Sequence, residues 1–168
     1  IGNTSATYGS DTFVLDTQLP AAPTTVTAPD ATNDTTPTFG WTGATDPAPS
    51  SGIASYTVEI WETAGPSKVK GPFTVPHTAD PHSWDLPAPD AFAGDGSEDG
   101  TYQIRVWTND AAGNTSTVYG SDTFVLDTQL PAAPTTVTAP NPTKDTTPTF
   151  SWTGASDPPP SSGIASYT

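Results

Sequence analysis

A block of sequence returns almost unchanged 111 residues further along the chain. Residues 8–29 recur letter for letter as residues 119–140, and aligning residues 1–57 with residues 112–168 leaves nine positions that differ. A fixed period as long as one small domain is typical of a tandem array, in which each repeat folds as a unit. The period favours a string of structural or binding modules over a single catalytic pocket. We therefore expect the chain to be part of a longer polypeptide of such repeats.

The chain is strongly acidic, with 4 Lys and Arg residues, 18 Asp and Glu residues and a net charge of −14. Nucleic acid is excluded as a partner, because neutralising phosphates requires clustered basic residues. The absence of Cys excludes a disulfide scaffold. No apolar run reaches the length of about 20 residues that a membrane-spanning helix needs, so we expect no membrane insertion in this segment.

Apolar residues alternate with polar ones along several short segments, which is the pattern of half-buried β-strands. Turn-forming Pro, Gly, Asn and Asp residues separate these segments. Alternation places Trp41, and Trp152 in the next copy, on the inward face of a strand. The pattern predicts an all-β fold, a β-sandwich, with strands at residues 25–28, 36–42, 53–62, 67–75, 82–86, 101–110 and 117–126.

Three segments resemble the bacterial immunoglobulin-like and fibronectin type III-like repeats of large extracellular surface proteins. They read TPTFGWTGATD…SGIASYTVEI from residue 36, DGTYQIRVWTNDAAGN from residue 99 and FVLDTQLPAAPT from residue 13. The resemblance implies tandem immunoglobulin-like sandwiches on the cell surface or outside the cell. Residues 1–16 are then the last strand of one repeat, 17–127 a complete repeat and 128–168 the first strands of the next.

The connection between repeats is the segment 15–23, which is copied at residues 126–134. Its two prolines fix their φ angles and limit bending, so we expect a semi-rigid connector. The predicted partners are neighbouring repeats or copies of the same chain. The predicted role is structural: a stalk, fibre or sheath whose length is set by the number of repeats. One form of this hypothesis is that the protein polymerises as a filament.

Carboxylates gather at the turns and connections. Asp95 and Asp99 lie in the acidic turn 94–100, Asp110 ends a predicted strand, and Asp16 and Asp127 occupy equivalent connector positions. Ca²⁺ takes about six to eight oxygen ligands, which such segments supply. These five residues are therefore candidate Ca²⁺ ligands, and the alternative is that they are solvated acids.

A second candidate site is the outer face of the predicted sheet. Trp61 and Trp107 each follow an inward residue, so each points outward, together with Glu59, Arg105 and Gln103. One interpretation is an aromatic pair packed with Arg105. The other is a face that stacks on sugars or packs against another chain.

Motifs that would indicate catalysis are absent from the sequence, including a Cys nucleophile, a Gly-x-Ser-x-Gly elbow and a phosphate-binding loop. Glu59 and Glu62 fall on opposite faces of their strand, which does not suit a pair of glycosidase carboxylates. The spacing of His77 and His82 is not that of a regular metal motif. We predict a non-enzymatic protein, with an adhesin-like or glycan-binding module, or a spacer in a polysaccharide-degrading enzyme, as alternatives.

Overall fold

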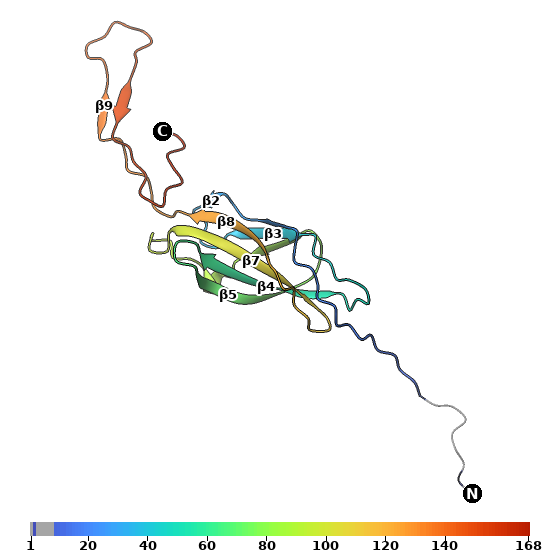
Figure 1. Cartoon of the computed structure of the whole chain (residues 1–168). Helices are drawn as coiled ribbons and strands as arrows, with labels where there is room; N and C mark the ends of the chain where they lie inside the picture. Colours follow the sequence, from blue (N-terminus) through green and yellow to red (C-terminus); the bar gives the residue numbers. More distant parts are fainter. Residues whose placement is uncertain (1, 3–8) are drawn as a thin grey trace.

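The computed structural model describes residue 2 and residues 9–168, and its regular structure is almost entirely β (Figure 1). The described residues contain no α-helix, and none of them forms a helix that could cross a membrane. The elements are β1 (Thr25–Thr27), β2 (Ala31–Thr32), β3 (Thr38–Thr42), β4 (Ile53–Glu62), β5 (Ser67–Pro76), β6 (His82–Asp85), the 3₁₀ turn η1 (Ala88–Asp90), β7 (Gly100–Asp110), β8 (Gly120–Leu126), β9 (Thr136–Thr138) and β10 (Ser151–Thr153).

The strands from β1 to β8 form two sheets. One has the order β1-β3-β6 and the other the order β2-β8-β7-β4-β5. All neighbours pair antiparallel except β2 and β8, which run parallel. The two long strands β4 and β7 pair with each other along most of their length.

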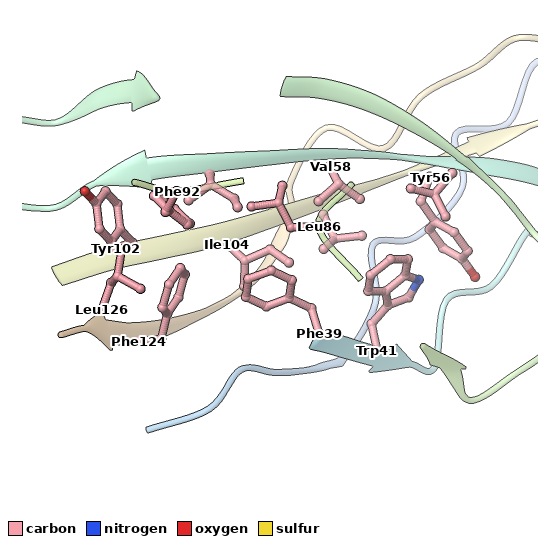
Figure 2. Packing of buried hydrophobic residues seen from close by; sticks show 13 residues of the cluster. Phe39, Trp41, Tyr56, Val58, Leu86, Phe92, Tyr102, Ile104, Phe124 and Leu126 are labelled. Carbon is pink, nitrogen blue, oxygen red and sulfur yellow. The ribbon is translucent and has the colours of Figure 1, made fainter. Parts of the chain in front are cut away.

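The two sheets share one hydrophobic core, as in a β-sandwich (Figure 2). The alternation expected from the sequence is present in both long strands: Tyr56, Val58 and Ile60 are buried in β4, and every second residue from Tyr102 to Asp110 is buried in β7. Aromatic rings join the sheets: Phe39 lies 5.3 Å from Phe124, and Trp41 lies 5.2 Å from Tyr56, between ring centroids. Burial of each such side chain contributes about 1.5–3 kcal/mol to stability.

Two elements differ from the sequence expectation. The sequence predicted no strand directly after residue 28, but beyond Pro29 and Asp30 the chain crosses to the other sheet as β2, where the amide of Val125 donates to the carbonyl of Asp30. The last strand begins at Gly120 rather than at residue 117. Ser116 explains the later start, because its hydroxyl bonds both the amide of Thr108 and the carbonyl of Val118 and so turns the chain.

Residues 128–168 form a hairpin of β9 and β10 that repeats the pairing of β1 and β3. Trp152 lies opposite Val137 as Trp41 lies opposite Val26. The burial differs, since Trp152 is 44% exposed and Trp41 only 2%. The predicted strand at residues 1–16 falls partly on residues 1 and 3–8, outside the described part, and residues 9–16 carry no strand.

Candidate functional site

The connector that precedes the sandwich is attached to it by hydrogen bonds. The carboxylate of Asp16 accepts from the amide of Ser51 at 2.7 Å and from that of Gln18 at 3.0 Å. Ala21 then donates its amide to the carbonyl of Thr45 at 2.8 Å. Pro20 and Pro23 of the connector are both buried. The connector is therefore attached to the sandwich at Asp16, Ala21 and its two prolines, whereas Leu15 and Leu19 are exposed.

Asp16 meets two further carboxylates at this end of the sandwich. Asp110 is the last residue of β7, and antiparallel pairing places it opposite Ile53 at the start of β4. The loop before β4 carries Asp46 to the same end. One carboxylate oxygen from each of Asp16, Asp46 and Asp110 lies within 4.8 Å of the others. We call these three residues the Asp triad.

The triad is largely shielded from solvent, with Asp16 6% and Asp110 3% exposed. Asp110 accepts from the backbone and side-chain amides of Asn114, at 2.8 and 2.7 Å. Asp46 uses Oδ2 to accept from Gly52 and from the hydroxyl of Ser50, both at 2.8 Å. Its other oxygen, Oδ1, is buried and has no hydrogen-bond partner.

Hydrogen bonds from Ser51 hold the pKa of Asp16 below its ordinary value, against the opposing effect of burial. The Asp16 carboxylate is therefore ionised at neutral pH. Ser162 lowers the pKa of Asp127 in the same way.

The five acids predicted as ligands divide between the two ends of β7. Asp16 and Asp110 are brought together, and Asp46, which was not predicted, completes the group. Asp95 and Asp99 lie near the other end of β7, outside the triad: Asp95 caps its own turn through Ser97, and Asp99 accepts from the amide and hydroxyl of Thr128. Asp46 recurs as Asp157 in the second copy, and this repetition was the sequence feature that pointed to Asp46.

Asp127 belongs to a second copy of the same arrangement. It accepts from the amide of Ser162 at 2.8 Å, as Asp16 does from Ser51. Asp157, the counterpart of Asp46, accepts from Gly163 at 2.8 Å through Oδ2. Oδ1 of Asp127 and Oδ1 of Asp157 are both buried without a partner.

The outer face of the five-stranded sheet carries the second predicted site. Trp61 lies opposite Gln103 and Trp107 opposite Thr57, so the pair formed by Glu59 and Arg105 separates the two Trp residues. All of these side chains are half-buried.

Arg105 organises this face. Its guanidinium lies 4.2 Å from the ring centroid of Trp61 and 4.9 Å from that of Tyr119, and its Nε donates to Gln103. The ring of Tyr119 in turn packs edge-on to Trp107 at 5.0 Å. Glu59 accepts from the indole of Trp61 and pairs with Lys68 at 3.1 Å. The sequence did not indicate Tyr119, because it was placed inside the last strand.

The two histidines occupy separate structural roles. His82 stacks on Trp41 with 4.6 Å between ring centroids, and burial lowers its pKa. Nδ1 of His77 lies 3.1 Å from the hydroxyl of Tyr56.

Comparisons with protein-family models, with curated proteins and with solved structures found no match. The function therefore has to be inferred from the repeat and from this geometry.

Proposed function

We propose that this protein is a non-enzymatic structural repeat of a long extracellular or cell-surface protein, a stalk, fibre or sheath of tandem immunoglobulin-like sandwiches. The observation that carries the proposal is the connector, which is attached in the same way in both copies. The bond from Ser51 to Asp16 recurs from Ser162 to Asp127, and the bond from Ala21 to Thr45 recurs from Ala132 to Ser156 at 2.7 Å.

A connector fixed at both ends favours a stiff array. The carboxylate of Asp127 accepts a hydrogen bond from Ser162 in the segment that follows. The next residue, Thr128, donates its amide to Asp99 in the preceding sandwich. Adjacent residues are thus tied to consecutive repeats, which leaves little free chain between them. Such a connection transmits orientation from one repeat to the next, as a stalk, fibre or sheath of fixed length requires.

The immunoglobulin-like assignment is supported by the strand pairing and by the two-sheet arrangement around Trp41. The extracellular location is supported by the tandem repeat and by the sequence resemblance. A non-enzymatic role is supported by the bonding of the polar groups. The carboxylates of Asp16 and Asp110 bind backbone and amide groups of the fold, and His82 is packed in the core.

Small-angle X-ray scattering tests the proposal on a chain with three copies of residues 17–127 in series. A stiff array predicts a maximum dimension that rises in proportion to the number of repeats, whereas freely jointed repeats approach a square-root dependence. Asp127→Ala in each repeat should shorten and broaden the distance distribution. Asp95→Ala is the matched control, because Asp95 bonds only within its own turn. Flexible scaling of the unaltered array would contradict the proposal.

The second candidate function is a glycan-binding or adhesin-like module that uses the outer face. The favouring observation is an aromatic strip of Trp61, Trp107 and Tyr119, the last 40% exposed. Titration of the chain with neutral and acidic oligosaccharides, followed by Trp fluorescence and repeated with Trp107→Ala, tests this function. Saturable quenching that the substitution abolishes would support it. A spacer inside a polysaccharide-degrading enzyme would use the same stiff connection as a stalk.

A further inference from the structure

Arg105, on the outer face of the five-stranded sheet, carries a positive charge that no carboxylate of the described chain neutralises. It lies directly opposite Glu59 in the pairing of β4 with β7. Both oxygens of Glu59 are already bonded, one to the indole of Trp61 at 2.8 Å and the other to Lys68 at 3.1 Å. The ion pairs among the described residues do not include Arg105. In a chain with 18 acidic residues, this guanidinium is therefore left free for an anion from outside.

The side chain of Arg105 is held in place before any ligand arrives. Its guanidinium lies 4.2 Å from the ring centroid of Trp61 and 4.9 Å from that of Tyr119, and Nε donates to Gln103 at 2.7 Å. The terminal amino groups have no acceptor among the described residues, so they are available as donors. A side chain fixed in this way loses little further freedom on binding, which favours affinity.

The surroundings of Arg105 indicate the kind of anion. A planar guanidinium fork matches a carboxylate, which it binds through two parallel hydrogen bonds. Tyr119, 40% exposed and edge-on to Trp107, offers an aromatic ring on which the apolar face of a sugar packs. The adjacent strand β8 places exposed Ser121 opposite Arg105, and exposed Thr123 lies two residues further along on the same face. Their hydroxyls donate to and accept from sugar hydroxyls.

We propose that this face binds acidic saccharides, those that contain uronic acids, with Arg105 holding the carboxylate. Tyr119 and Trp107 pack against the sugar ring, and Trp61 and Gln103 are positioning residues that orient the guanidinium. The inference rests on the second candidate function, glycan binding, and gives its ligand a chemical class. The structural role of the repeat does not depend on it.

The amount of exposed aromatic surface and the net charge both support a small ligand held by local contacts. Trp61 and Trp107 are half-buried, so the free aromatic surface is mainly that of Tyr119. A stable protein interface buries about 800 Å² on each partner, far more than this strip offers. A chain of net charge −14 repels polyanions at long range, so non-specific attraction would not imitate the binding.

Titration of the 168-residue chain with trigalacturonic acid and with galactotriose, its counterpart without carboxylates, tests the proposal. Calorimetry and Trp fluorescence follow the binding. We expect one saturable site for the acidic saccharide, because Arg105 is the only Arg in the sequence. The acidic saccharide should bind at least about tenfold more tightly than the neutral one, since a hydrogen bond to a charged group contributes more than a neutral one.

Three variants locate the effect. Arg105→Gln should lower the affinity for trigalacturonic acid at least about tenfold and remove the preference over galactotriose. Arg105→Lys keeps the charge but lacks the planar fork, so it should also bind more weakly. Lys144→Gln is the matched control, because it removes the same charge from the exposed segment after β9 and should leave binding unchanged. Far-UV circular dichroism checks that each variant is folded.

The proposal is overturned if Arg105→Gln and Lys144→Gln bind trigalacturonic acid alike. It is equally overturned if the chain instead forms a dimer that Arg105→Gln abolishes, since the face would then pack against another protein chain. Equal affinity for the two saccharides would overturn this inference but leave glycan binding intact, whereas binding of neither would overturn both.

Discussion

The repeat provides a matched experiment on the hydrophobic core, because the same Trp occurs in two copies with different burial. Trp41 is 2% exposed between the two sheets, and Trp152 is 44% exposed on the β9–β10 hairpin. Their immediate neighbours are the same Thr-Gly-Ala on one side and Phe with one further residue on the other. The substitutions Trp41→Ala and Trp152→Ala therefore differ mainly in the packing around the ring.

The expected costs follow from this difference. Trp41 packs on Tyr56 and on His82, with ring centroids 5.2 and 4.6 Å away, so its removal leaves a cavity between the sheets. Replacing a buried Trp by Ala costs about 3–5 kcal/mol. Trp152 contacts mainly Tyr167, at 5.1 Å, and its substitution should alter the unfolding of the sandwich by no more than about 0.5 kcal/mol.

Urea denaturation followed by far-UV circular dichroism measures both costs, since this signal does not depend on indole fluorescence. Calorimetry should show Tm lowered by at least about 10 °C for Trp41→Ala, at roughly 4 °C or more per kcal/mol for a domain of this size. If Trp41→Ala fails to fold, the milder pair Phe39→Leu and Phe150→Leu replaces it, because Phe39 is 1% and Phe150 55% exposed. Equal losses for the two copies would refute the assignment of the core.

Three further predictions concern the backbone and the titrating groups. Gly43→Ala should destabilise the fold more than Gly52→Ala, measured by Tm. Both glycines have positive φ (79° and 84°), but of the two only Gly43 would place a Cβ against a neighbour, the hydroxyl of Thr24. Because burial lowers the pKa of His82 below the ordinary 6.5, the unfolded chain protonates first, so Tm should fall as the pH drops from about 7.5 to about 5.5, and should fall less for His82→Phe. Burial raises the pKa of Tyr102 to about 12 and also raises the pKa of Tyr56, so an ultraviolet titration should show late-ionising phenols, and Tyr102→Phe should remove one of them.

Local pattern was sufficient to predict the long strands. Burial alternates from Tyr56 to Ile60 in β4 and from Tyr102 to Asp110 in β7, and the buried positions carry Tyr, Val, Ile or, near the end of β7, Thr or Asp. The two residues of β2 carry no such pattern, since a two-residue strand is defined by its partner rather than by its own sequence. Their pairing with Val125 and Leu126 depends on the sheet already being present.

The candidate site was only half predictable for a related reason. Asp95 and Asp99 attracted attention because acids are dense in their turn, but density along the chain does not measure proximity in space. Asp46 stands alone in the sequence and reaches Asp16 and Asp110 through the topology of β4 and β7. Antiparallel pairing of those two strands places the loop before β4 beside the end of β7. Combining that pairing with the equivalence of Asp46 and Asp157 would have identified the third carboxylate.

The distribution of charge bears on how the connector is held against the sandwich. A chain of net charge −14 has few cations, and two of them, Lys68 and Lys70, neutralise acids on the body of the sandwich. The carboxylates at the connection are therefore held by amide donors of the fold, from Ser51, Gly52 and Asn114, rather than by basic side chains. Because the bond from Ser51 to Asp16 joins the connector to the sandwich, this arrangement supports the stiff connection of the proposed function.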